Sequence, residues 1–125
     1  MRINKEQTIR ILALFFFAAG INHFIMPSFY LPLIPNYFPL PKLLNILAGV
    51  AEIVLGVGLF FQKTRSYSGI GIAILMVAFI PSHWHFIQEG SCLNESLCVP
   101  AWIAWMRLII IHPILIAIGV WASRG

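Results

Sequence analysis

Two ionisable side chains, Glu52 and Arg107, stand inside long apolar stretches of this sequence. A charge in hydrocarbon is costly and rare, so by default it indicates a site for an ion, a proton or a ligand. Both lie in the same half of a helix bundle, roughly 14 Å and 10 Å below one end at 1.5 Å per residue. We expect an ion pair between them, because pairing lowers the cost of each buried charge. Two roles stay open: a pair that fixes helix register, and a polar pocket that binds a ligand, a proton or a partner's side chain.

Further polar side chains are expected in the same half of the bundle. The candidates for binding a ligand or a proton are Asn22, His23, Asn45, His83, His85 and His112. His83 and His85 are about 200° apart on an ideal helix, so they do not suit one metal ion. We expect histidines that are hydrogen-bonded within the bundle, and no metal site. Proton-coupled chemistry, or a metal or haem held with His23, are the alternatives.

The composition indicates that the chain lies in a membrane. Of 125 residues, 60% are apolar and 10% are charged, against roughly 25% charged residues in an ordinary soluble domain. So few charges neither cover the surface of a soluble domain nor keep a chain disordered. The net charge of +4 comes from cations at the ends of the apolar stretches. We therefore expect membrane lipids as partners and no nucleic acid.

Four apolar stretches are each long enough to cross about 30 Å of hydrocarbon as a helix. The predicted helices are residues 7–26, 42–61, 66–86 and 99–122, within one domain of residues 1–125. We predict an all-α fold, a transmembrane four-helix bundle of up-down-up-down topology, because helices satisfy their own backbone in lipid. Glycines at positions 49, 56, 58, 69 and 71 would let these helices approach closely. Pro113 predicts a kink in the last helix, because it removes a backbone donor.

The distribution of cations predicts the orientation in the membrane. Lys42 alone lies on one side of the expected bundle, outside the spans. The cations of the other side are Arg2, Lys5, Arg10, Lys63, Arg65 and Arg124. Lysine and arginine collect on the cytoplasmic side of membrane proteins, so both termini are expected to be cytoplasmic. The expected location is the cell membrane, with several passes, and specifically the bacterial cytoplasmic (inner) membrane.

The two outer connections have features of their own. Residues 27–41 contain five prolines, which exclude a regular helix. This segment is expected either as an interfacial loop on the membrane or as a lid over the outer end of the bundle. Residues 87–98 contain Cys92 and Cys98 on a side that is oxidising in a bacterial envelope. A structural disulfide is expected there, with free thiols and a redox-active pair as alternatives.

Several motifs carry a resemblance to a known family, the DoxX-like membrane proteins. Residues 19–24 (AGINHF) are similar to part of the first helix of that family, and residues 49–56 (GVAEIVLG) resemble its G-x-x-E-x-x-x-G second helix. Other matching positions are Pro27, Phe29, Tyr30, Pro81 and Arg107. The resemblance covers nearly the whole chain and implies a four-helix membrane bundle. It assigns functional positions to His23, Glu52 and Arg107, whereas the cysteine pair departs from its pattern.

The resemblance also implies a range of functions. Its members have been linked to quinone-dependent sulfur oxidation, to assembly of redox enzymes and to oxidative-stress complexes, and an animal branch to receptor assembly. We expect an integral membrane accessory protein with an outward-facing polar pocket, serving a redox- or quinone-linked complex. Quinone is the expected ligand, and a membrane protein or a second copy of the chain is the expected partner.

Other functional classes remain as alternatives. They are a non-enzymatic assembly factor or chaperone, and a small lipid- or ligand-binding or transport protein. No residue is assigned as catalytic, because the sequence contains no nucleophile elbow, phosphate loop or dinucleotide fingerprint. Enzymatic activity is therefore not expected of the isolated chain.

Overall fold

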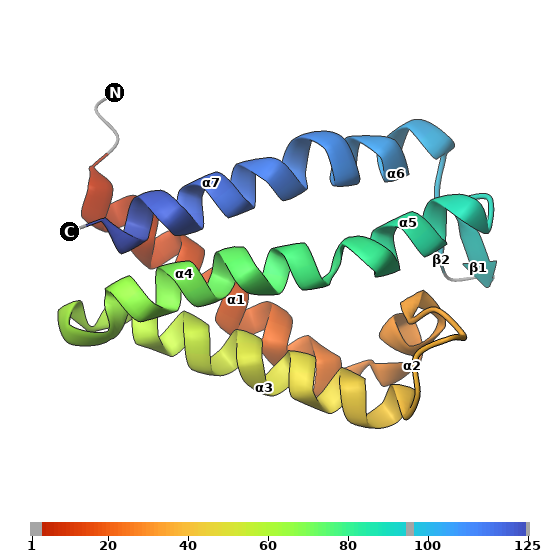
Figure 1. Cartoon of the computed structure of the whole chain (residues 1–125), viewed down its shortest axis with the longest axis horizontal. Coiled ribbons are helices and arrows are strands. Elements are labelled where there is room, and N and C mark those ends of the chain that lie inside the picture. Colours follow the sequence, from red (N-terminus) through yellow and green to blue (C-terminus); the bar gives the residue numbers. More distant parts are fainter. Residues whose placement is uncertain (1–3, 95–96, 125) are drawn as a thin grey trace.

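Long apolar helices dominate the structure, a computed structural model that describes residues 4–94 and 97–124. The helices are α1 (Lys5–Ile25), α3 (Pro41–Phe60), α4 (Gln62–Ala78), α5 (Ile80–Gln88), α6 (Ala101–Met106) and α7 (His112–Ser123). The shorter elements are α2 (Pro27–Tyr30), η1 (Leu31–Leu33), the π turn η2 (Arg107–Ile111), β1 (Cys92–Asn94) and β2 (Leu97–Cys98). Figure 1 shows these elements as one elongated bundle. The predicted all-helical fold with four long apolar helices is confirmed.

Two prolines interrupt the longer helices without ending them. Pro81 stands at the start of α5, which continues the line of α4 after a break at Phe79 (Figure 1). In the fourth long helix Pro113 follows η2, where the backbone N–H of His112 donates to the carbonyl of Arg107, five residues earlier. The predicted kink near Pro113 thus takes the form of a widened turn, which relieves the proline's clash with the preceding carbonyls.

Glycines bring the backbones of two helix pairs into contact. Between α1 and α3, a Cβ on Gly20 would lie 2.7 Å from the carbonyl oxygen of Gly49. Between α4 and α7, a Cβ on Gly69 would lie 2.5 Å from the carbonyl oxygen of Gly119. Small residues permit such close approach where helices pack in lipid. Gly49 and Gly69 are among the glycines that the sequence predicts at helix contacts, whereas their partners, Gly20 and Gly119, are not.

The two helix pairs pack against each other at the end of the bundle that holds both termini. A buried apolar cluster joins them there; its members are Ile9, Leu12, Ala13, Phe16, Leu59, Ile72, Met76 and Ala122. Arg65 closes this end, because its guanidinium donates to both carboxylate oxygens of Glu6 at 3.0 Å and to the carbonyl of Leu59 at 2.9 Å. The ammonium group of Lys5 donates to the carbonyl of Arg124.

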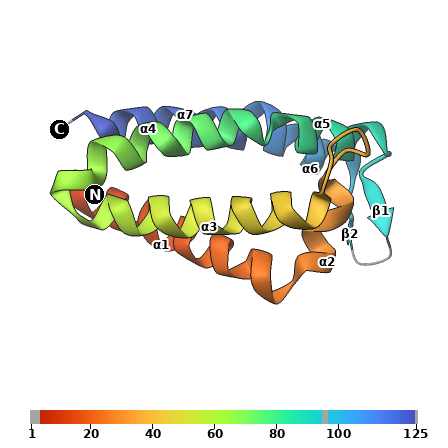
Figure 2. The ribbon, with the colours of Figure 1, turned by 60° about the horizontal axis from the view of Figure 1, so that its bottom comes forward.

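The opposite end of the bundle carries the irregular segments. The proline-rich segment begins with the short helical turns α2 and η1 and then runs as turns to α3. Phe29 and Leu33 pack against the buried Phe86 and Ala104 of α5 and α6. The segment therefore covers this end of the bundle (Figure 2).

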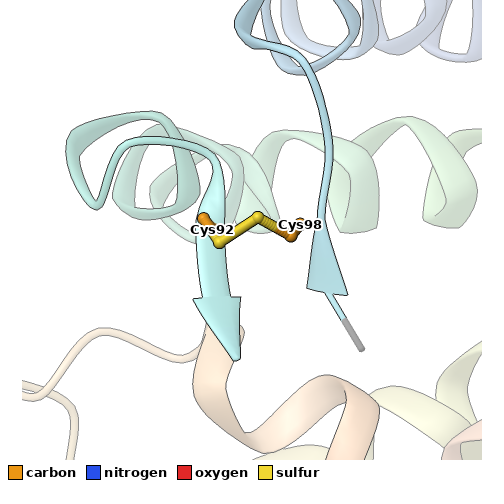
Figure 3. Close-up of a disulfide and its surroundings, with 2 residues drawn as sticks. All are labelled: Cys92 and Cys98. Carbon is orange, nitrogen blue, oxygen red and sulfur yellow. A yellow bond between two sulfur atoms is a disulfide. The ribbon is translucent and has the colours of Figure 1, made fainter. Parts of the chain in front are cut away.

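A small hairpin joins α5 to α6 at the same end. Its strands β1 and β2 are antiparallel, with Cys92 opposite Cys98. A disulfide connects the two cysteines (Figure 3), as the sequence predicted. The tip of the connection expected at 87–98, residues 95–96, lies outside the described residues.

Replacing Gly20 or Gly69 by alanine should destabilise the protein, because the new methyl group would meet a backbone oxygen. We expect the midpoint of thermal unfolding in detergent to fall, by the equivalent of about 1–3 kcal/mol. Gly71→Ala is the matched control: its methyl would meet only the end of the Leu55 side chain, which can rotate away. Equal losses in all three variants would show that backbone contact is not the cause.

Candidate functional site

A cavity of about 640 Å³ lies between the two helix pairs, on the side away from the termini. Its volume falls in the range of small-molecule sites, which are mostly apolar with a few placed polar groups. Most of its lining is aliphatic or aromatic. The polar lining consists of His23, Tyr30, Asn45, Glu52, Ser82, His83, Arg107 and His112. The cavity thus brings together most of the polar residues that the sequence analysis singled out.

His23 and Asn45 form a reciprocal pair on the wall made by α1 and α3. The side-chain amide of Asn45 donates to the backbone carbonyl of His23 at 3.0 Å, which leaves the amide oxygen as an acceptor. That oxygen lies 2.7 Å from Nδ1 of His23, so Nδ1 carries a proton and donates it. Asn45 therefore fixes both the tautomer and the orientation of the imidazole.

Glu52 completes this wall beside His23. Its Oε2 lies 3.3 Å from Nε2 of His23, and both side chains are buried. Because Nδ1 is already occupied, the edge between Nε2 and Oε2 can hold one proton, as imidazolium and carboxylate or as imidazole and carboxylic acid. Both forms are neutral as a pair. In the part of the chain that the structure describes, Nε2 of His23 is the only donor beside Oε2, at a distance that is long for a hydrogen bond, so this buried oxygen is weakly satisfied.

The sequence predicted an ion pair between Glu52 and Arg107, and this prediction is wrong. Glu52 contacts His23 instead, and no carboxylate among the described residues lies within 4.0 Å of the Arg107 guanidinium. The reason is lateral placement: α1 touches α3 through Gly20 and Gly49, which sets His23 directly against Glu52. Arg107 belongs to the other helix pair, across the cavity, with its guanidinium 6.0 Å from the ring of Phe86.

The wall opposite Glu52 carries cationic and imidazole groups. In a π turn, residues five apart share a face, so Arg107 of η2 and His112, the first residue of α7, both face the cavity. Nε2 of His112 donates to the carbonyl of Met76 at 2.6 Å. The ring of His83 packs edge-on against that of His112, with 4.4 Å between centroids. Pro113 in the sequence predicted a distortion here. It predicted neither the π turn nor the face that Arg107 and His112 share.

Tyr30 is a cavity residue that sequence reasoning did not select as a site. Its ring stacks on the imidazole of His23 with 3.8 Å between centroids. Its hydroxyl accepts a hydrogen bond of 2.7 Å from the side-chain amide of Asn22. Asn22 thus supports the site from outside the cavity lining. Tyr30 was one of the positions that resemble the DoxX-like pattern, and this resemblance was the available signal.

His85 does not line the cavity, in contrast to His83. The two side chains point to different faces of α5, as their spacing on a helix predicts. Within residues 4–94 and 97–124, no three His, Cys, Asp or Glu side chains are grouped closely enough to hold a metal ion.

Comparison with known proteins gives one match. A family model described as "Domain of unknown function (DUF8561)" matches residues 12–124. No curated protein matches the chain, and no solved structure matches it. The description of the matched family does not mention DoxX-like proteins, so the resemblance to them stays a hypothesis.

The contact between His23 and Glu52 can be tested with a double-mutant cycle. His23→Leu leaves a buried carboxyl group without its neighbour, so we expect a loss of about 3–5 kcal/mol in unfolding free energy. The double variant H23L/E52L should lose less than the sum of the two single variants, because neither member of the His23–Glu52 pair is then left buried alone; the lost contact with Asn45 is common to H23L and the double variant. The measurement is chemical unfolding in mixed micelles, with His85→Leu as control. Additive losses would contradict the contact.

Proposed function

We propose that this chain, which belongs to the domain of unknown function family DUF8561, is a multi-pass membrane protein that binds a quinone-type ligand. It acts as an accessory protein of a redox-linked membrane complex. The single observation that supports ligand binding is a cavity lined by the buried carboxyl group of Glu52, which has only His23 beside it, and by Arg107, which has no carboxylate partner among the described residues.

Membrane insertion is supported by the outer surface of the bundle. Four helical stretches, each with 20 or more residues, are apolar enough to cross a bilayer. Large apolar side chains project from them, for example Leu14, Val54 and Ile74, each at least 58% exposed. Exposed aromatic residues lie toward both ends: Trp84, Trp102 and Trp105 near the hairpin, and Tyr67 and Trp121 near the termini. Tryptophan and tyrosine favour the two interfaces of a membrane.

The chemistry of the walls defines the ligand. The carboxyl group of Glu52 lines the cavity and accepts a hydrogen bond from a hydroxyl group of the ligand. Arg107 carries five N–H donors and no acceptor, and a carbonyl or phenolate oxygen satisfies it. A quinone headgroup carries oxygens on opposite sides of a flat ring, and its reduced form adds the hydroxyl donors. The aromatic lining, including Phe15, Phe29 and Phe79, suits such a ring.

The neutral pair of His23 and Glu52 supports proton exchange with the ligand. Either member holds the single proton between Nε2 and Oε2, so the pair can pass it to a ligand oxygen or receive one. Asn45 keeps the imidazole in place during either event, because it holds Nδ1 and the backbone of His23 together. A partner protein in the membrane would supply the electron transfer, which makes this chain an accessory subunit.

The membrane orientation can be measured with single introduced cysteines. The cationic end, which includes Lys63 and Arg65, is proposed to face the cytoplasm, and the end with Lys42 the outside. A membrane-impermeant maleimide added to intact cells should label Lys42→Cys and should label Lys63→Cys only after lysis. The reverse pattern would overturn the orientation. Equal labelling of both variants in intact cells would overturn membrane insertion.

Ligand binding can be measured with decylubiquinol and decylubiquinone on the protein in nanodiscs. Native mass spectrometry should show one bound molecule per chain. Glu52→Leu and Arg107→Gln should each weaken binding by about tenfold or more, because a hydrogen bond to a charged group contributes roughly 1.5–3 kcal/mol. His85→Leu is the control outside the cavity. Unchanged binding in the two cavity variants, or none by the wild-type protein, would contradict the proposal.

A further inference from the structure

We propose that the cavity opens sideways into the bilayer between α1 and α7, and that the ligand's apolar chain leaves through this seam. The inference rests on the proposed function and adds the route and the ligand class. The site would take a membrane-resident amphipath, with a polar head between Glu52 and Arg107 and a hydrocarbon chain in the lipid.

Side chains that both line the cavity and reach the outer surface mark an opening. Phe15 of α1 and Ile111 of η2 line the cavity and are 54% and 42% exposed, respectively. They stand on the two helices that border the seam. Both side chains are wholly apolar, so this opening suits the passage of a hydrocarbon chain rather than of water.

The seam exists because α1 and α7 diverge. Near the termini they lie together, with the ammonium group of Lys5 4.9 Å from the ring centre of Trp121. Toward α2 the two helices separate, as both views show (Figures 1 and 2). The glycine contacts hold α1 to α3 and α4 to α7, so the separation falls between the pairs. Nothing comparable to Gly20 and Gly49 joins α1 to α7 among the described residues.

The outer end of the cavity is covered, which favours a lateral route. Phe29 and Leu33 pack on α5 and α6. Tyr30 is held twice, by the amide of Asn22 and by stacking on His23. The proline-rich segment therefore acts as a lid over this end, one of the two roles that its sequence left open.

A second seam, between α3 and α4, is a less suitable exit. Leu47 and Ala78 also line the cavity and reach the surface there. Below them, however, Leu55 fills the space between these helices, in contact with Gly71 and with the buried apolar cluster. Among the described residues the backbones of α3 and α4 approach each other at several places, whereas those of α1 and α7 scarcely do. Phe15 and Ile111 themselves border the α1–α7 seam.

The experiment is photolabelling in nanodiscs with decylubiquinol that carries a diazirine at the end of its chain. Adducts are located by mass spectrometry of peptides, and unlabelled decylubiquinol competes for specific labelling. We expect competed adducts on the outer faces of α1 and α7, at Ile11, Phe15, Ile111 and Ile114. Competed adducts at residues 37–40 instead would indicate an exit through the lid, and adducts at Leu47 or Ala78 an exit between α3 and α4. Either would overturn the inference.

A pair of variants tests the route by kinetics. The double variant Phe15→Trp/Ile111→Trp should slow the loading of decylubiquinol from the lipid by about tenfold. This corresponds to an increase of roughly 1.4 kcal/mol in the barrier to entry. Leu14→Trp, on the lipid-exposed face of the same helix and outside the cavity lining, should leave the loading rate unchanged. The thermal midpoint of each variant shows whether it is folded. Equal loading rates would overturn the seam as the route.

The two proposals fail in different ways. If decylubiquinol binds but labels neither side of the α1–α7 seam, only the route is wrong. If it neither binds nor gives competed adducts, the proposed ligand itself is wrong.

Discussion

The contact of backbone with backbone at paired glycines is the constraint on which the site depends. Where Gly20 meets Gly49, there is no room for a methyl group on either helix. This contact sets the register of α1 against α3, and the register places His23 beside Asn45 and Glu52. The polar wall is therefore a consequence of helix packing, and its three side chains require no loop to position them. In lipid, where apolar burial does not drive helices together, such close packing is a main source of association.

The cavity is a consequence of the rigidity of the two helix pairs. Each pair is tight along the length where its glycines meet, and the pairs join through the apolar cluster and through the Glu6 and Arg65 network near the termini. At the other end the pairs stand apart, and α2 and η1 cover the gap. Two polar walls thus face each other across an apolar interior. Neither wall satisfies the other, and within the described chain Oε2 of Glu52 has only the nearby Nε2 of His23 on its own wall.

The helices and the disulfide could be predicted because their signals are local. Long apolar stretches bounded by prolines and charges define the helices, and two cysteines six residues apart in a short connection can meet. The partner of Glu52 could not be predicted from the sequence. The sequence gives the depth of a residue along its helix, but a contact also depends on which helices are neighbours and which faces they turn to each other. Glu52 and Arg107 agree in depth but belong to different helix pairs. Tyr30 was missed for a related reason, since only the fold of α2 brings its ring onto His23.

The π turn constrains the number of residues in the fourth long helix, independently of their side chains. Each residue removed from an α-helix rotates the remainder of the helix by about 100°. If the same residues wound as a regular helix with none removed, Arg107 could still face the cavity, but Gly119 would turn away from Gly69. Restoring that glycine contact would instead turn Arg107 out of the cavity. The extra residue, taken up by the wide turn, lets one continuous helix satisfy two neighbours at once. A single-residue deletion between 107 and 111 would let the turn close as a regular one, so it should be better tolerated than a deletion elsewhere in this helix.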